Sequence, residues 1–357
     1  MFRITLWSDN IPHDLYALER YGLGGSEAAL TNLAWEFAEL GHHVTVLCQS
    51  PNGSHKYKNI VCHDLNSPYK QQALDCDLFI SLRSGLPFLT EDLSKAKTKV
   101  FWSQDTRYHG SIEHLFVNTK GLLFNIDKIV VISDYSYNQI KKEGVEAINN
   151  KLVKIQNGYQ HRFLISPVKN QDIINCVYAS QPDRGLQYLI DMWPAISKEV
   201  PEARLHLFSS RKLYGQGQDS VNEWMFVRAK RYPNIEVHEP VCQKELSAIY
   251  STMDCYLYSN AFEEAGCMAL KEAMANHCTA VVSNLGALTE KVERDKNGFV
   301  ICGHPDQSAY QIDFVAKTVE LLSNKEVLRS FQAKAYETVV DWTWANRANS
   351  WLDLLNE

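Results

Sequence analysis

Two glutamates with seven residues between them, Glu264 and Glu272, have the most specific spacing for chemistry in this sequence. The apolar run Cys255–Tyr258 predicts a strand, residues 259–266 a loop, and Cys267–Asn276 a helix. A loop after a parallel strand lies at the crevice of the sheet, where we expect Glu264. Eight helical residues at about 100° each would bring the second carboxylate to within roughly 80° of the first, so the pair can serve one ligand. A solvated helix charge is the alternative for Glu272.

A glycine-rich segment, Gly22 to Glu27 (GLGGSE), offers a second place for chemistry near the N-terminus. It opens a predicted helix from Ser26 to Leu40, and the N–H groups of Gly24 and Gly25 at such a helix start let a phosphate approach closely. A tight turn capped by Ser26 is the structural alternative. The long stretch Ser8 to Tyr21 separates these glycines from the first strand, unlike the dinucleotide-binding fingerprint.

The elements that would position these residues follow an α/β pattern, because short apolar runs alternate with segments of helical period. This pattern predicts parallel sheets built from βαβ units. Predicted helices also include Leu186–Glu199, Lys244–Ser251 and Thr343–Leu355. The predicted strands are Phe2–Trp7, Val44–Cys48, Leu78–Ser81, Val100–Ser103, Ile129–Ser133, Val153–Ile155, Ile174–Ala179, Arg204–Phe208, Ile235–His238, Cys255–Tyr258 and Ala280–Ser283.

A chain of 357 residues exceeds what one core usually supports, so we expect two domains. The polar segment 166–171, which contains Pro167, marks the boundary between residues 1–167 and 168–340. Residues 341–357 are expected to form a helix that returns to the N-terminal domain.

The sequence resembles the family 4 retaining glycosyltransferases, in which a Glu-x7-Glu motif of this form marks the donor site. The resemblance covers nearly the whole chain and implies the GT-B fold: two Rossmann-like domains with parallel sheets facing a central cleft, and a C-terminal helix that packs across the domains. The N-terminal domain would then serve the acceptor and the C-terminal domain the nucleotide-sugar donor. The matching residues are Gly24–Glu27, Asn157-Gly158, Arg184-Gly185-Leu186, Glu264, Glu272–Ala275, Gly286, Glu290 and Asn297-Gly298.

The resemblance also implies roles for individual residues. Glu272 would hold the nucleotide ribose hydroxyls, and Glu264 would contact the donor sugar near the reacting carbon. Gly24 and Gly25 would present N–H groups to the diphosphate or the sugar. Arg184 stands where the family usually has Lys, and its guanidinium would stabilise the departing diphosphate in place of a metal ion. The expected reaction is metal-independent transfer with retained anomeric configuration.

Further donor contacts are expected at Gly266 and Cys267, where the helix between the two glutamates begins. The family usually has an additional Arg shortly before the position of Arg184, and this chain lacks it. A second cation must therefore come from elsewhere, and Arg211 and Lys212, after the strand Arg204–Phe208, are the candidates.

On the acceptor side, many relatives have a histidine where this chain has Gln104-Asp105. Gln104 cannot accept a proton, whereas Asp105 could orient or deprotonate the acceptor hydroxyl, with His109 as a less favoured substitute. A strand-end cap or turn residue is the structural alternative for Asp105. The leaving phosphate of a retaining enzyme can itself take the acceptor proton, so a protein base is not required.

Other functions share parts of this pattern. A sugar-nucleotide 2-epimerase of the same fold would have a similar donor site, and a non-catalytic two-domain sugar-binding protein would close on its ligand in the same way. An NAD-dependent oxidoreductase ranks last, because no Gly-x-Gly-x-x-Gly motif follows a strand. We expect a glycosyltransferase that uses a nucleotide sugar, with UDP- or GDP-sugars favoured, and a saccharide or lipid-linked acceptor.

The composition limits the kinds of partner and cellular location that we expect for this protein. The formal charge of −6 is spread over both halves, so no nucleic-acid partner is expected. The nine cysteines are scattered and never form Cys-x-x-Cys, which argues against both a disulfide framework and a zinc site. The chain begins with a strand-like run and contains no apolar segment of about 18 residues. These features predict a cytoplasmic protein with at most peripheral membrane contact.

Overall fold

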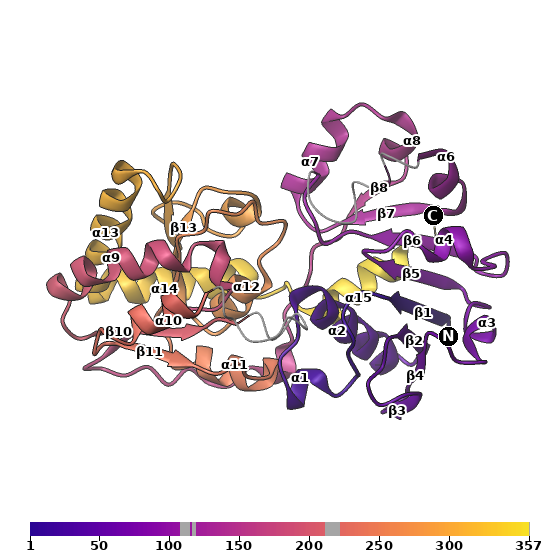
Figure 1. The fold of residues 1–357 in the computed structure, drawn as a ribbon, viewed down its shortest axis with the longest axis horizontal. Helices are drawn as coiled ribbons and strands as arrows, with labels where there is room; N and C mark the ends of the chain where they lie inside the picture. Colours follow the sequence, from indigo (N-terminus) through magenta and orange to yellow (C-terminus); the bar gives the residue numbers. More distant parts are fainter. Residues whose placement is uncertain (108–114, 116–118, 211–221, 357) are drawn as a thin grey trace. The chain divides into compact units, whose positions relative to one another are not determined.

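The computed structural model describes residues 1–107, 115, 119–210 and 222–356. The chain folds into two compact units, one formed by Met1–Gly158 with Trp342–Glu357 and the other by Tyr159–Asp341. Each unit combines one sheet with packed helices (Figure 1). The residues after Gly158 belong to the second unit, where the Ser247 hydroxyl donates a hydrogen bond of 3.0 Å to the carbonyl of Phe163. The division therefore falls at Gly158, ahead of the predicted position at Pro167.

The sheet of the first unit has the strand order β3-β4-β2-β1-β5-β6-β7-β8. Its pairs are parallel, as predicted, with one antiparallel pair, β3 with β4. A tight turn at Lys58, whose φ is 51°, joins these two antiparallel strands. The strands are β1 (Arg3–Ser8), β2 (His43–Cys48), β3 (His55–Tyr57), β4 (Ile60–Asp64), β5 (Leu78–Leu82), β6 (Thr98–Trp102), β7 (Lys128–Val131) and β8 (Leu152–Lys154).

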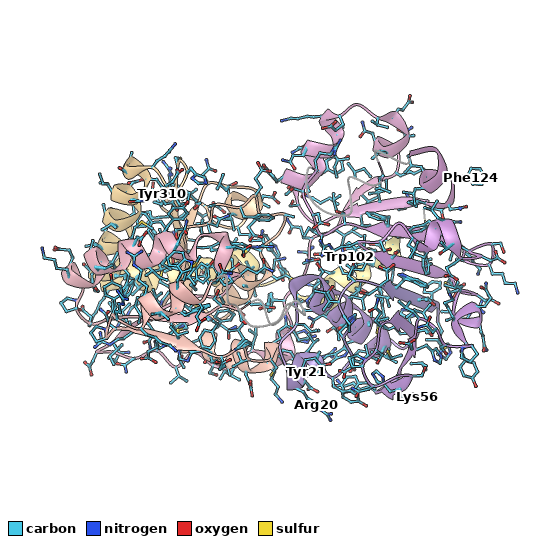
Figure 2. The ribbon with its side chains drawn as sticks, viewed as in Figure 1. Arg20, Tyr21, Lys56, Trp102, Phe124 and Tyr310 are labelled. Atoms are coloured by element: carbon cyan, nitrogen blue, oxygen red, sulfur yellow. The ribbon has the colours of Figure 1, made fainter. Side chains whose placement is uncertain are left out.

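Most helices of the first unit are short, and two longer ones pack against each other. These are α2 (Gly25–Glu39) and α15 (Trp344–Asp353). Trp351 of α15 also meets Trp102, a core residue labelled in Figure 2, with ring centroids 4.9 Å apart. Because α15 covers α2, helix α2 is buried on all sides from Glu27 to Ala38. The other helices are α1 (Ala17–Arg20), α3 (Lys70–Ala73), α4 (Pro87–Thr90), α6 (Thr119–Leu122), α7 (Asp134–Lys142) and α8 (Glu146–Asn149).

The sheet of the second unit is parallel throughout, with the order β11-β10-β9-β12-β13-β14. The winding changes direction between β9 and β12, which makes this position the topological switch point of the sheet. The loops after these two strands therefore line the crevice where ligands bind in open α/β sheets. The strands are β9 (Ile174–Tyr178), β10 (Ala203–Phe208), β11 (Ile235–His238), β12 (Cys255–Tyr258), β13 (Thr279–Ser283) and β14 (Gly298–Ile301).

Two groups of helices surround this sheet. The first comprises α9 (Leu186–Glu199), α10 (Glu223–Ala229) and α13 (Ser308–Ser323), and the second α11 (Gln243–Tyr250), α12 (Met268–Ala275) and α14 (Lys325–Val339). Tyr310 of α13, labelled in Figure 2, lies in the core with its hydroxyl 2.7 Å from that of Ser283 on β13. Within the described residues, no helix has the length and apolar character needed to cross a membrane.

Candidate functional site

An ion pair lies at the switch point of the second unit. Arg184 follows β9 and Glu264 follows β12, and the Nη1 of Arg184 donates to the Oε1 of Glu264 at 2.6 Å. The side chain of Glu264 is only 7% exposed, whereas that of Arg184 is 27% exposed. The buried carboxylate thus holds a guanidinium that still reaches solvent, where it can meet an anion.

Two glycines allow the loops around this pair to approach closely. A Cβ at Gly185 (φ 118°) would stand 2.1 Å from the carbonyl oxygen of Ser259, and one at Gly286 (φ 67°) would stand 2.2 Å from that of Glu264. Both glycines have a positive φ that other residues rarely adopt. The amide of Ala287 also donates to the Glu264 carbonyl at 2.7 Å. The backbone around Arg184 and Glu264 is therefore fixed by contacts that only glycine permits.

Two aromatic residues complete the surroundings of the ion pair. The buried hydroxyl of Tyr258 donates to the same Oε1 of Glu264 at 2.5 Å. The guanidinium of Arg184 lies over the ring of Phe262, 4.4 Å from its centroid. Burial raises the pKa of Tyr258, so its hydroxyl keeps the proton that it donates. Sequence reasoning placed Tyr258 at a strand end and missed this role.

The second glutamate of the motif lies in a different part of the unit. Glu272 of α12 lines a small recess and accepts a hydrogen bond from the amide of Gln243, at the start of α11. Burial raises the pKa of Glu272 to about 7, against the lowering effects of Gln243 and Lys271. The recess is lined by Tyr159, Gln160, Phe163, Leu164, Gln243, Ser247, Glu272 and Asn276. Glu264 is not among these residues, so each glutamate has its own environment.

Gly266 and Cys267 lie where α12 begins. Gly266 is buried and Cys267 half-buried, and Cys267 is the N-cap residue of the helix with an unusual φ of 17°. No side chain among the described residues caps this helix. Its first N–H groups are therefore not occupied by a side-chain cap.

A buried cation that the sequence analysis did not single out lies near the ion pair. Lys291 is 3% exposed, and its Nζ donates to the carbonyl of Ala287 at 3.1 Å. Burial lowers the pKa of Lys291, and Cys267, Glu290 and Glu264 act in the opposite direction. The predicted cations Arg211 and Lys212 lie outside the described residues.

In the first unit, the glycine-rich segment forms a helix start without a side-chain cap. Helix α2 begins at Gly25 with Gly24 as its N-cap, so the alternative of a cap at Ser26 is wrong. A Cβ at Gly25 would meet nothing within 4 Å. This glycine therefore leaves open space beside the positive end of a 15-residue helix.

Two polar side chains are buried in this same unit. Glu27, in the first turn of α2, is 1% exposed, and His13, in the loop after β1, is 0% exposed. Among the described residues, the Oε1 of Glu27 and the Nε2 of His13 have no hydrogen-bond partner. Burial lowers the pKa of His13, while Glu27 and Asp14 act to raise it.

Asp105 follows β6 and forms a bidentate ion pair with Arg83, which follows the neighbouring strand β5. The Nε and Nη2 of Arg83 donate to the two carboxylate oxygens of Asp105 at 3.0 and 2.9 Å. Gln104 instead exchanges hydrogen bonds with Asn157. The alternative base, His109, lies outside the described residues. Arg83 was not predicted as a partner, and only the register of adjacent strands brings it to Asp105.

One Asp-x-Asp spacing, the form of many metal sites in transferases, occurs at Asp75-Cys76-Asp77. This segment precedes β5, whereas Arg83 follows it, so the two lie at opposite ends of that strand. Asp75 pairs with Arg3 at 3.0 Å, and Asp77 pairs with Lys97 at 2.8 Å. These carboxylates are held by neighbouring cations, and they lie away from the strand ends that carry the candidate site.

Comparisons with known proteins agree with this architecture. Residues 172–324 match the family described as Glycosyl transferases group 1. Spore coat protein SA of Bacillus subtilis (strain 168) is 24% identical over 163 residues, which are 44% of this chain and 42% of that protein. The alignment thus spans less than half the length of this curated relative.

Solved structures resemble the whole chain. Sucrose-phosphate synthase from Thermosynechococcus elongatus has a TM-score of 0.78 at 15% identity and covers 99% of this chain and 98% of its own. Anabaena HepE in complex with UDP and glucose has a TM-score of 0.73 at 13% identity, with 100% of both chains covered. A glycosyltransferase from Rickettsia africae has a TM-score of 0.69 at 15% identity, with 99% and 97% covered.

These structural likenesses give the fold, and the family match lies in the unit that carries Arg184, Glu264 and Glu272. Residues 172–324 thus match the group 1 glycosyl transferases, and the fold of the chain is GT-B.

Proposed function

We propose that this protein moves a sugar from a UDP-sugar to a hydroxyl of a saccharide or lipid-linked acceptor, with retention and without a metal ion. The observation that carries the proposal is the Arg184–Glu264 pair at the switch point, inside the segment that matches the family. A solvent-reaching guanidinium held by a buried carboxylate suits a leaving diphosphate.

The choice of uridine follows from the relatives. Anabaena HepE was solved in complex with UDP-glucose, and the pneumococcal O-GlcNAc transferase GtfA in complex with UDP and GlcNAc. The latter has a TM-score of 0.59 at 15% identity and covers 92% of this chain and 60% of its own. In this chain, Glu272 in its recess would accept hydrogen bonds from the ribose hydroxyls.

The proposed step breaks the bond between the anomeric carbon and the diphosphate oxygen. The diphosphate leaves with the electron pair, and Arg184 stabilises the growing negative charge. Lys291 supplies the second positive charge that the missing family arginine would give. The acceptor hydroxyl adds on the face that the diphosphate leaves, and its proton passes to the leaving phosphate oxygen. Glu264 positions Arg184 and the donor sugar and forms no covalent bond to the sugar.

The first unit would supply the remaining groups that contact the donor and the acceptor. The open start of α2 at Gly24 and Gly25 would donate N–H groups to the donor diphosphate or sugar. Asp105, held by Arg83, would orient the acceptor hydroxyl.

A nucleotide screen followed by a transfer assay tests the proposal. UDP, GDP, ADP and CMP are added separately, and the unfolding temperature is measured. A ligand at 100 times its dissociation constant stabilises a protein by about 2.7 kcal/mol, so UDP should give a clear shift. UDP-sugars are then incubated with saccharide and lipid-linked acceptors, and proton NMR reports the anomeric configuration of the product.

Two variants of the second unit make the assay specific. Glu264→Gln should slow transfer, because the amide no longer holds Arg184 by charge, although less than loss of Arg184 itself. Lys317→Met, which removes an exposed ion pair with Glu320 in the same unit, should leave transfer unchanged. No shift with any nucleotide would contradict the proposal. An epimerised UDP-sugar formed without acceptor would indicate the epimerase, and binding without turnover would indicate a sugar-binding protein.

A further inference from the structure

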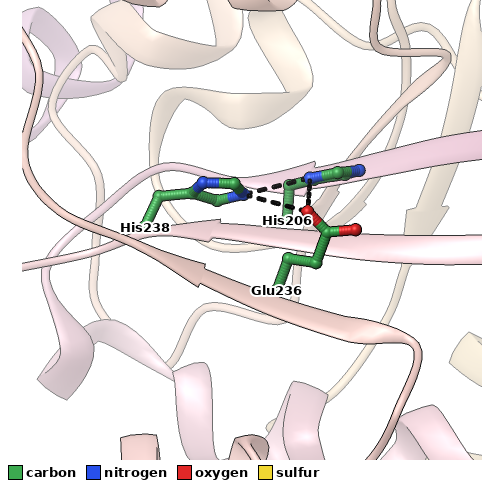
Figure 3. A group of neighbouring side chains, drawn as sticks. All are labelled: His206, Glu236 and His238. Carbon is green, nitrogen blue, oxygen red and sulfur yellow. Dashed lines mark hydrogen bonds and ion pairs between the residues drawn. The ribbon is translucent and has the colours of Figure 1, made fainter.

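A group of three potential metal ligands lies in the second unit, away from the residues assigned to the donor. His206 is on β10, and Glu236 and His238 are on the neighbouring strand β11, at the end of the sheet order (Figure 3). His206 pairs in register with Glu236, and Glu236 and His238 are two positions apart. Side chains two apart on a strand share a face, so all three project from the same side of the sheet.

This face of the sheet is partly open to solvent. Along β10, Leu205 and Leu207 are buried, while the intervening His206 is half-buried. The exposed fractions of the side chains are 12% for His206, 33% for His238 and 53% for Glu236. An ion can therefore reach the group from solvent through the side on which Glu236 lies.

The separations between the ligand atoms suit a tetrahedral ion. The Nδ1 of His206 lies 3.1 Å from the Nε2 of His238 and 3.6 Å from the Oε2 of Glu236, and the latter two atoms are 3.8 Å apart. Two ligand atoms that bind Zn²⁺ at about 2.0–2.1 Å in tetrahedral geometry are about 3.3 Å apart. The three atoms thus need shifts of only a few tenths of an ångström to bind one ion.

Neighbouring side chains already orient both imidazoles. The Nε2 of His206 lies 3.2 Å from the Oδ1 of Asn175, which accepts a hydrogen bond from it, so that Nδ1 carries the lone pair and faces the group. The ring of His238 stacks on Phe208, with centroids 4.4 Å apart and planes within 3°. Such outer contacts fix metal ligands in known sites.

We propose that His206, Glu236 and His238 bind a divalent transition metal ion of the Zn²⁺ type, with water in the fourth position. Two imidazoles and one carboxylate are a ligand set that suits Zn²⁺. Mg²⁺ and Ca²⁺ are not expected to bind, because both ions prefer an all-oxygen shell.

The ion links β10 to β11 through side chains as well as the backbone ladder. His238 is the last residue of β11, and the chain then continues through residues 239–242 to Gln243, which binds Glu272. The site lies outside the residues that would contact the donor, so the bound ion is not expected to take part in the transfer step. Bound Zn²⁺ is expected to raise the unfolding temperature of the full chain, because it binds only the folded arrangement.

Zinc binding to the untagged full-length chain tests the proposal. Competition with a chromophoric chelator should give one tightly bound Zn²⁺ per chain, and Co²⁺ should give the intense visible absorption of four-coordinate cobalt. His206→Ala with His238→Ala should abolish both signals. Cys302→Ser is the matched control, because Cys302 is the exposed thiol among the described cysteines and His304 lies two residues away. Binding that survives the double variant, or that Cys302→Ser removes, would overturn the proposal.

Two milder variants protect the test against misfolding. Glu236→Gln changes an exposed side chain and should weaken Zn²⁺ binding while the unfolding temperature of the metal-free chain stays the same. Asn175→Ala should weaken binding by about 10- to 100-fold, as loss of an outer contact does in known sites. Equal affinities for these variants and the unaltered chain would contradict the proposed ligand set.

Discussion

The two units differ in how their candidate site residues are held. In the second unit, Arg184 binds Glu264 and Gln243 binds Glu272, so the charged groups are positioned by protein partners. In the first unit, the start of α2 has no side-chain cap, and Glu27 carries a buried oxygen without a partner among the described residues. The second site is preassembled, whereas the first presents groups that a ligand can satisfy.

The family match follows the same division. Residues 172–324 match the glycosyl transferases and lie within the second unit. In the proposed function the second unit would bind the nucleotide diphosphate, which is common to many donors, so its residues can keep one arrangement. Acceptors differ in shape, and Gln104-Asp105 in the first unit stands where the family resemblance implies a histidine. The comparison predicts large effects from changes in the second unit and smaller effects from changes in the first.

The largest effect is expected from Arg184→Met. Loss of the guanidinium removes charge stabilisation from the leaving diphosphate, and kcat should fall by about 100- to 1,000-fold. Arg184→Lys should recover part of the activity, because it retains the charge without the fork that binds Glu264. Steady-state kinetics with a UDP-sugar measure both variants, and circular dichroism confirms that they fold. A kcat that is unchanged in Arg184→Met would remove the central residue of the proposed mechanism.

Glu272→Gln is expected to act on binding and on pH dependence. A hydrogen bond to a charged group contributes about 1.5–3 kcal/mol, so the variant should bind UDP roughly 10- to 100-fold more weakly. In the unaltered chain, UDP affinity should rise as the pH passes about 7, where the Glu272 carboxyl ionises, and in the variant this rise should disappear. Calorimetric titration at several pH values measures both effects.

Glu272→Gln should weaken UDP binding but increase the stability of the folded protein. The folded pKa of about 7 lies above the ordinary value of 4.5, so the folded state holds the extra proton and loses stability as the pH rises through this interval. Glu272→Gln carries no such charge. Above the folded pKa, its free energy of unfolding should exceed that of the unaltered chain by up to about 3 kcal/mol. A variant that is less stable at every pH would show that the carboxylate is not strained by burial.

The sequence predicted strands best where apolar residues either ran together or alternated regularly with polar ones. Ile235–His238 and Cys255–Tyr258 have the predicted bounds. β14 was missed because it begins with Gly298, which reads as a turn, although a Cβ there would stand 2.4 Å from the carbonyl oxygen of Ala280. β3 was missed because its residues, His55–Tyr57, are largely polar. The local pattern therefore predicts strands whose apolar residues recur regularly, including the edge strand β11, and misses polar strands and strands that begin at a close backbone approach.

The sequence could predict which single residues belong to the candidate site where a motif marks them, but it could not predict which of them contact each other. The sequence placed Glu264 after a strand, and the family resemblance singled out Arg184, but 80 residues separate the two, and only the strand order shows that they pair. Lys291 has no local motif, and its importance comes from burial near Glu264. Residues such as these become visible only when the sheet brings distant loops together.

Replacing one glycine by alanine in each unit compares the two kinds of site directly. Gly25→Ala adds a methyl group in open space, so the free energy of unfolding should change by less than about 1 kcal/mol, in the stabilising direction. Donor turnover should fall about tenfold if the backbone of α2 meets the diphosphate, in proportion to the loss of one charge-assisted contact. Gly286→Ala forces a clash with the Glu264 backbone and should lower the unfolding temperature. Turnover equal to that of the unaltered chain in Gly25→Ala would exclude the start of α2 from the donor site.

The smallest effect is expected from Asp105→Asn. Both carboxylate oxygens already accept hydrogen bonds from Arg83, and the leaving phosphate can take the acceptor proton, so kcat should fall by less than about tenfold. The change should appear mainly in KM for the acceptor, because the amide no longer holds Arg83 by charge. Arg83→Met should give the same shift in KM, and combining the two changes should add little, since they remove one interaction. A fall in kcat of a thousandfold or more in Asp105→Asn alone would instead identify Asp105 as the acceptor base, and the first unit would then contain chemistry as decisive as that of the second.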